Sequence, residues 1–409
     1  MNHRKVLTAL VAVATALGLA AGTAGANTPQ AGGGSTRGVT DTEITVGGIG
    51  QAAFYAPGVE VGAEARFKVE NDKGGVNGRE INFLGFRDDG GDNAQNIDEA
   101  RKLVQEDEIF AAVPVITPAL GGADVFQQNK TPFFGWGISA PFCGNPFGFG
   151  FSGCLTPPDP TTASSAWGEM MSTALGGGKG KTAAVIAEDN DSGKTGAAVI
   201  GASAKAGGFK VVYQENPVPP PPAPTPDVTP YANDIMTSDG GNPPDVVFVV
   251  TSFSNVGVIG GKLQELGYQG ALTNAVGYDP SFVGPYKGTS VFIQFNAFES
   301  AAEGNTNMQQ IIDNIHAVQP DITLTQPVLS GYLSADLFVR VLKKAGKDLT
   351  AEKFLQVANA FKYSYKDVTG TVKFPKAHTH GSQCGSLVES DGTNYTINVP
   401  YACYTEVKL

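Results

Sequence analysis

AAVPVITPALGGADVFQQNKTPFFGWGISAP, residues 111–141, is the stretch that decides the fold of this chain. Its first six residues, 111–116, form a short apolar run rich in β-branched side chains, which predicts a buried strand. Pro118 can open a helix, and apolar residues recur behind it at helical spacing, at Ala119, Leu120, Ala123 and Phe126. Residues 132–136 are a second apolar run. Strand, helix and strand within about thirty residues predict a parallel βαβ unit and an α/β fold.

Each strand of this unit ends beside a hydroxyl residue, Thr117 after the first and Ser139 after the second. In open α/β sheets, ligands lie outside the carboxyl ends of the strands. Both residues can offer a hydroxyl and a backbone N–H to a small polar group. We therefore predict that Thr117 and Ser139 hold a carboxylate of a ligand.

The first 26 residues have the pattern of a secretory signal peptide. Arg4 and Lys5 precede a small-residue apolar segment, and Ala24-Gly25-Ala26 is a small-x-small cleavage site. Residues 27–41 are rich in Gly, Thr and Ala and are expected to be a flexible lead-in. Because no cysteine precedes Cys143, we expect a soluble exported protein, periplasmic or extracellular, and not a lipoprotein.

The chain is acidic, with 28 Lys and Arg against 39 Asp and Glu and a net charge of −11 over 409 residues. An acidic chain, read here as having no basic clusters, argues against nucleic acid and against anionic membrane surfaces as partners. The charge balance carries no information about the fold.

Four cysteines in a protein exported to an oxidising compartment predict two disulfides. Three connectivities are possible. The local pairing joins Cys143 to Cys154 and Cys384 to Cys403, and we expect these two bonds because each closes a short loop.

Two successive series of strands and helices follow one another along the chain and predict two lobes. Strands are expected at residues 44–49, 81–86, 182–187, 209–213, 245–250 and 271–275, and helices at 59–71, 162–175, 194–206, 231–237 and 255–266. Residues 217–226 are proline-rich and are expected to be a solvated surface insertion.

Residues 48–53, Gly-Ile-Gly-Gln-Ala-Ala, follow a strand and partly match a dinucleotide-binding fingerprint. In a true fingerprint the helix begins at the glycines, whereas Pro57-Gly58 delays it here. The glycines are therefore interpreted as turn residues, and we expect neither enzyme activity nor a cofactor. His378 and His380 lie in a polar segment and are read as solvated residues, so no metal site is predicted.

Several further segments, in this order along residues 44–374, resemble the branched-chain amino-acid type of periplasmic solute-binding protein that serves ABC importers. They are Lys73-Gly-Gly-Val-Asn-Gly78, the Asp88-Asp89 turn, residues 132–139, Gly331-Tyr332 with Ala335, Ala345-Gly346 and Gly370-Thr-Val-Lys-Phe374.

The resemblance implies the two-lobed type I periplasmic-binding-protein fold, in which each lobe is a parallel sheet flanked by helices and three crossovers form the hinge. Lobe 1 would comprise residues 42–161 and 298–365, and lobe 2 residues 162–297 and 366–409. The ligand would bind in the cleft between them by hinge closure.

The same resemblance assigns further ligand contacts. In this family, hydroxyls and amides at the positions of Thr117 and Ser139 hold an amino acid's carboxylate. The carbonyl of Gly137 would accept from the ammonium, and Tyr55 would cover the ligand side chain. Phe253 would supply an aromatic ring from lobe 2.

Lobe 2 departs from the family pattern at two positions. Ser192 stands where an aromatic residue is usual, and the acid that often binds the ammonium is missing near Val276, with only the displaced Asp279 nearby. The missing acid weakens the assignment of an amino acid as the ligand and favours considering a carboxylate that carries no amine.

The sequence therefore predicts a monomeric substrate-binding protein that delivers an amino acid or a related organic acid to an ABC permease. A sensor of the same fold that signals to a membrane receptor is the alternative. A secreted dinucleotide-dependent enzyme is a third hypothesis, which rests only on the glycine match at residues 48–53.

Overall fold

The computed structural model describes residues 36–53, 56–221, 223, 227–285 and 287–409. The predicted signal peptide, most of the lead-in, Tyr55 and part of the proline-rich insertion lie outside the described residues. Among the described helices, none combines the length and the apolar composition that a membrane span needs.

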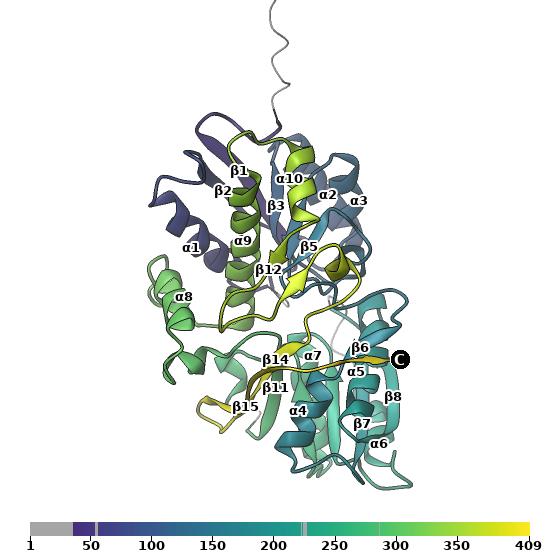
Figure 1. The fold of residues 1–409 in the computed structure, drawn as a ribbon. Helices are drawn as coiled ribbons and strands as arrows, with labels where there is room; N and C mark the ends of the chain where they lie inside the picture. The colour runs from purple at the N-terminus through teal and green to yellow at the C-terminus, as the bar shows by residue number, and fades with distance from the viewer. Residues whose placement is uncertain (1–35, 54–55, 222, 224–226, 286) are drawn as a thin grey trace, which may run out of the picture. The chain divides into compact units, whose positions relative to one another are not determined.

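The first lobe is built on a five-stranded parallel sheet (Figure 1). Its strands, in the order β2-β1-β3-β4-β5, are β1 (Glu43–Gly50), β2 (Glu80–Asp88), β3 (Ala111–Ile116), β4 (Phe133–Gly135) and β5 (Gly148–Gly150). Its helices are α1 (Val59–Asn71), α2 (Asn93–Gln105), α3 (Ala123–Gln128), α8 (Thr306–His316), α9 (Gln326–Ala345) and α10 (Ala351–Ala358). The predicted βαβ unit is confirmed as β3, α3 and β4.

The side chains of β3 are divided between two apolar cores. Ala111 and Val113 pack in the cluster that contains α1 and α9, whereas Ala112 and Val115 pack in the cluster that contains α2 and α3. Residues of a strand point to opposite faces in turn, so helices must cover both faces of this sheet.

Helix α3 begins at Ala123, so the prediction that it begins at Pro118 was wrong. The amide of Ala119 instead donates to the hydroxyl of Thr117 in a local turn. The amide of Gly122 donates to the Asn96 side chain on α2 at 2.7 Å, and a Cβ at Gly122 would lie 2.5 Å from Ala100. This close approach to α2 holds residues 117–122 out of the helix.

The second lobe is built on a seven-stranded sheet. Its strands, in the order β15-β14-β11-β10-β9-β7-β8, are β7 (Thr182–Glu188), β8 (Lys210–Val218), β9 (Val246–Val250), β10 (Ala271–Asn274), β11 (Thr289–Ile293), β14 (Cys384–Ser390) and β15 (Tyr395–Cys403). Its helices are α4 (Ala166–Ala174), α5 (Asp191–Ala206), α6 (Thr229–Met236) and α7 (Phe253–Glu265). Strands β7 to β11 are parallel, whereas β14 and β15 are antiparallel.

Two sequence expectations change in the second lobe. Strand β8 continues through Pro217 to Val218, which an edge strand tolerates because its outer N–H groups need no partner. Thr162–Ser164, expected to begin a helix, forms β6 and pairs with β16 (Glu406–Lys408). This partner strand belongs to the C-terminal segment, more than 240 residues further along the chain, so no local sequence pattern predicts the pairing.

Both predicted disulfides are confirmed, Cys143–Cys154 and Cys384–Cys403. Cys384 and Cys403 are register partners in the β14–β15 pair, so this bond fastens the antiparallel edge of the second sheet.

The chain crosses between the lobes three times, after β5, after β11 and after β13 (Val372–Lys373), which pairs with β12 (Lys362–Tyr363). Short 3-10 turns η1 (Ala140–Phe142), η2 (Pro280–Phe282), η3 (Phe298–Ala301) and η4 (Lys376–His378) lie in the connections. Phe374, after β13, packs on Phe149 of β5 with ring centroids 5.0 Å apart. The exact lobe boundaries stay a prediction.

A buried ionic network joins α1 to α9. Arg66 contacts Asp336 at 2.7 Å and Glu70 at 2.8 Å, and Arg340 and Lys343 contact the same two carboxylates. Burial alone would lower the pKa of the Arg66 guanidinium, but the neighbouring carboxylates raise it above its ordinary value. The network therefore stays charged and fixes the register of the two helices.

We expect Asp336→Ala to lower the free energy of unfolding by about 3–5 kcal/mol, because it leaves Arg66 buried beside half of its counter-charge. Urea denaturation measures this. Asp72→Ala is the control, since the Lys68–Asp72 pair is exposed and should contribute less than about 1 kcal/mol. Equal losses in the two variants would contradict the role given to the network.

Candidate functional site

A cavity of about 210 Å³ lies where residues of both lobes and of the crossovers meet. Most of its wall is apolar. The apolar lining comprises Pro118, Trp136, Ile138, Cys154, Leu155, Pro157, Ala163, Trp167, Val199, Ile200, Val249, Val250, Ala275, Val276 and Phe292. Such a concave, largely apolar space with a few polar groups is the usual form of a small-molecule site.

Two tryptophans give the cavity its aromatic walls. The Trp136 indole N–H donates to the Gln294 side chain at 3.2 Å, and that of Trp167 donates to the Thr273 hydroxyl at 2.9 Å. Phe292 stacks on Trp167 with centroids 5.5 Å apart and ring planes 11° apart. Since both indole donors are satisfied by the protein, the rings offer apolar faces to an occupant.

Several hydrogen bonds connect the lobes beside the cavity. They include the Trp136–Gln294 bond, a bond from the Ser192 hydroxyl to the Ile138 carbonyl at 3.2 Å, and one from the Gln326 side chain to the Ala275 carbonyl at 3.0 Å. The Thr156 hydroxyl also donates to the Ile138 carbonyl, at 3.0 Å. Ser192, predicted from the sequence as a site residue, therefore lies in the cavity wall.

The N-terminus of α5 opens onto the cavity through Asn190, Ser192 and Gly193. The Asn190 side chain caps the helix by accepting from the Gly193 amide at 2.7 Å. A Cβ at Gly193 would lie 2.0 Å from the Glu188 carbonyl oxygen, so only glycine lets the helix begin this close to β7. A helix N-terminus favours negative charge.

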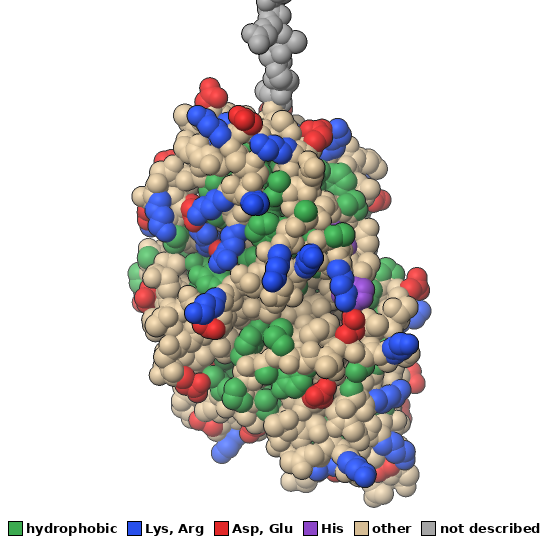
Figure 2. Space-filling view, viewed as in Figure 1, with side chains coloured by type: hydrophobic (Ala, Val, Ile, Leu, Met, Phe, Trp, Pro, Cys, Tyr) green, Lys and Arg blue, Asp and Glu red, His purple; other side chains and the backbone are tan. Residues whose placement is uncertain are grey.

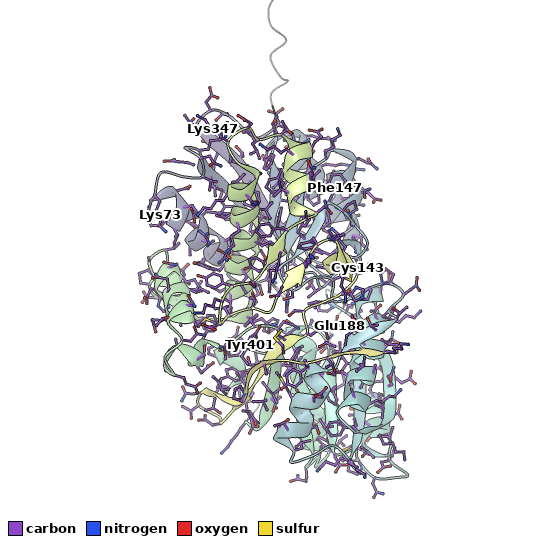
Figure 3. The ribbon with its side chains drawn as sticks, in the orientation of Figure 1. Lys73, Cys143, Phe147, Glu188, Lys347 and Tyr401 are labelled. Carbon is purple, nitrogen blue, oxygen red and sulfur yellow. A yellow bond between two sulfur atoms is a disulfide. The ribbon has the colours of Figure 1, made fainter. Side chains whose placement is uncertain are left out.

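Two carboxylates lie in the wall, and both have partners within the protein. Glu188, at the end of β7 (Figure 3), accepts from the Ser252 amide at 2.8 Å and from the side chains of Asn255 and Asn190 at 3.0 and 3.3 Å. Glu406 pairs with His380 at 3.3 Å and with Lys376 at 3.5 Å. Among the described residues, no Lys or Arg lines the cavity.

Thr117 and Gly137 do not line this cavity. The Thr117 hydroxyl is buried near Asp89, whose pKa is raised by burial although hydrogen bonds from Gly91, Asn96 and Thr117 oppose the shift. The carbonyl of Gly137 accepts from the Leu155 amide at 3.0 Å, and a Cβ at Gly137 would lie 2.1 Å from the Gly153 carbonyl oxygen. Their predicted ligand contacts stay predictions.

Ser139 follows Ile138 of the wall, and its side chain is fully buried. Its hydroxyl has no hydrogen-bond partner within the described part of the chain. A buried hydroxyl without a partner is unfavourable. Ser139 itself is not among the residues that line the cavity, so its predicted ligand contact stays a prediction.

Phe253 and Asp279 lie outside the cavity wall. Phe253 is buried and packs on Phe282 with centroids 5.6 Å apart, and Asp279 caps η2 by accepting from the Ser281 amide at 2.8 Å. Tyr55 is outside the described residues. Sequence reasoning missed Trp136, Trp167 and Gln294 as wall residues. Trp136 and Gln294 carried a usable signal, since they directly follow the carboxyl ends of β4 and β11.

His378 precedes the crossover residues 379–383, which line the cavity. Its ring packs between Phe149 and Phe374, and Nε2 lies 2.7 Å from the Asn359 side-chain oxygen. Burial lowers the pKa of His378 below its ordinary value of 6.5. The sequence reading of this histidine as solvated was wrong, because the crossover folds back onto β5.

The depressed pKa of His378 makes stability depend on pH. The unfolded chain takes up this proton more readily than the folded one, so stability is complete above pH 6.5 and falls as the pH drops toward the folded pKa. We expect His378→Gln to reduce the loss of unfolding free energy at acidic pH, measured by urea denaturation over a range of pH values. His316→Gln, at the end of α8, is the comparison variant. If the free energy of unfolding of His378→Gln falls at acidic pH as much as that of the parent protein, this assignment is refuted.

Ser139→Ala should leave the stability of the ligand-free protein unchanged or raise it by about 1 kcal/mol, because it removes a buried hydroxyl that has no partner within the described structure. Ser386→Ala is the matched control. That serine is equally buried but donates to the Phe295 carbonyl at 2.7 Å, so its loss should cost about 1 kcal/mol. Thermal unfolding separates the two. A similar loss in Ser139→Ala would make Ser139 an ordinary structural residue.

A model of the periplasmic binding protein family matches residues 44–394 of this chain. A comparison of the sequence with curated proteins found no match.

Solved structures with the same fold cover most of the chain. An ABC-transporter substrate-binding protein of Aeropyrum pernix has a TM-score of 0.70 and 17% identity, over 89% of this chain and 97% of that one. A solute-binding protein of an R. palustris ABC transporter, in complex with benzoate, has a TM-score of 0.68 and 17% identity, over 88% and 98%. A fatty acid ABC transporter substrate-binding protein of Thermomonospora curvata has a TM-score of 0.67 and 15% identity, over 90% of this chain and 94% of that one. At these identities the likeness shows the fold.

Proposed function

This chain belongs to the family of periplasmic binding proteins, and we propose that it is the extracytoplasmic, monomeric substrate-binding protein of an ABC importer. Its solute would be a small carboxylate with an apolar body and no amine, which it delivers to a membrane permease. It would bind without catalysis.

The observation that carries this proposal is the cavity wall, which draws aromatic faces from both lobes. The Ser192–Ile138 and Trp136–Gln294 hydrogen bonds join the lobes beside it. Both bonds run between the lobes, so a separation of the lobes would break them. A solute that fills the space and touches both walls would therefore favour the closed arrangement over the open one.

The polar groups of the site support a carboxylate without an amine. The N-terminus of α5 favours a negative group, and the Ser139 hydroxyl, which has no partner among the described residues, adjoins the wall residue Ile138. An ammonium would have to compete for Glu188 and Glu406 with the groups that already donate to them. The solved relatives named for benzoate and fatty acid binding make the same solute class a reasonable one to test here.

We expect benzoate to raise the midpoint of thermal unfolding and leucine, at the same concentration, to have little effect, because only a bound solute stabilises the native state. Ser139→Ala should weaken benzoate binding by roughly ten- to hundredfold in calorimetric titration, as the loss of a hydrogen bond to a charged group does. Ser386→Ala should leave the affinity unchanged. If leucine stabilises the protein as strongly as benzoate does, the proposal of an amine-free solute fails.

A further inference from the structure

The positive charge of this acidic protein is concentrated in residues 340–376. This segment contains nine of the 28 Lys and Arg but only three of the 39 Asp and Glu. Eight of the nine cations are lysines, at positions 343, 344, 347, 353, 362, 366, 373 and 376. The rest of the chain is correspondingly more acidic than the net charge of −11 suggests.

All eight lysines are exposed, and they lie on elements that adjoin one another in the first lobe. They belong to the end of α9, α10, β12, β13, η4 and the links between them. Figure 2 shows Lys and Arg side chains gathered over this part of the first lobe, with Lys347 labelled beyond the end of α9 in Figure 3. We call these eight lysines the basic face.

Most of the basic face is not neutralised within the protein. Lys343 and Lys376 pair with Glu70 and Glu406, and Lys366 lies 4.0 Å from Asp367. Within the described structure, the other five lysines have no carboxylate within ion-pair distance. Glu352 of the segment instead pairs with Lys130.

Two of these five lysines lie directly opposite each other. Lys362 of β12 and Lys373 of β13 are register partners in an antiparallel pair, and both are exposed. Like charges in opposed positions destabilise such a pair. The hairpin therefore keeps a charge arrangement that does not serve its own stability, which points to an external anion.

We propose that the basic face docks on an anionic membrane surface through phospholipid headgroups. Protein interfaces favour arginine and aromatic residues and are poor in lysine, whereas this face is almost entirely lysine. The exposed large apolar side chains of the described structure are Leu84, Leu266 and Leu409, and none lies in residues 340–376. A face of hydrated point charges without an apolar centre suits a diffuse layer of headgroups better than a protein partner.

This inference is independent of the solute and revises the expectation drawn from the net charge. Charges more than a Debye length apart are largely screened, so a local lysine cluster can meet an anionic surface although the whole protein is acidic. Docking would hold the protein near the membrane in which its proposed permease lies.

Sedimentation with phosphatidylcholine vesicles, with and without phosphatidylglycerol, tests the proposal. The full chain should sediment only with phosphatidylglycerol vesicles and should be released at about 1 M salt, where the Debye length is about 3 Å. Lys344→Glu/Lys373→Glu should lower the bound fraction by at least about tenfold, since each lysine near an anionic surface contributes about a factor of five.

Lys205→Glu/Lys210→Glu, which reverses two exposed lysines of the second lobe, is the control for net charge and should keep vesicle binding. Thermal unfolding of Lys373→Glu alone controls for folding. This variant should be at least as stable as the parent protein, because the introduced carboxylate would face Lys362 and replace a repulsion by an ion pair. Absence of vesicle binding, equal losses in both double variants, or binding to vesicles without phosphatidylglycerol would overturn the proposal.

Discussion

The parallel pairing of strands is the constraint on which the rest of this structure depends. It forces the carboxyl ends of the parallel strands in each sheet to one edge, and it requires helices on both faces to return the chain. In each lobe the same edge therefore collects the loop residues. Ile138 after β4, Ser192 after β7 and Gln294 after β11 meet at the cavity for this reason.

The C-terminal segment completes the site by tying two crossovers together. Strand β16 pairs with β6 in the first crossover, and Glu406 accepts from the Thr162 hydroxyl while it pairs with Lys376 and His380 of the third. The crossovers thus form part of the cavity wall and are held by groups that lie far apart in sequence. Their geometry depends on the folded chain as a whole.

The difference between local patterns and contacts made over long sequence distances explains what the sequence could predict. Hydrophobic periodicity is a local property, and it located most strands and helices and the βαβ unit from residue 111 onward. The β6–β16 pair, the burial of His378 and the tryptophan walls depend on partners that are distant in sequence. Thr117 and Ser139 were rightly placed at strand ends, yet only the structure shows that Asp89 lies near the first hydroxyl while the second has no partner among the described residues.

Buried charges and surface charges meet different requirements. Inside the protein, Arg66 and Glu188 each have charged or hydrogen-bonding partners, because an isolated charge removed from water is strongly unfavourable. On the surface no such requirement holds, so charge can be distributed for interactions outside the fold. A net charge averages over both regions. The basic face therefore becomes apparent only when exposure and pairing are considered residue by residue, and five of its eight lysines are charges that no ion pair within the described structure explains.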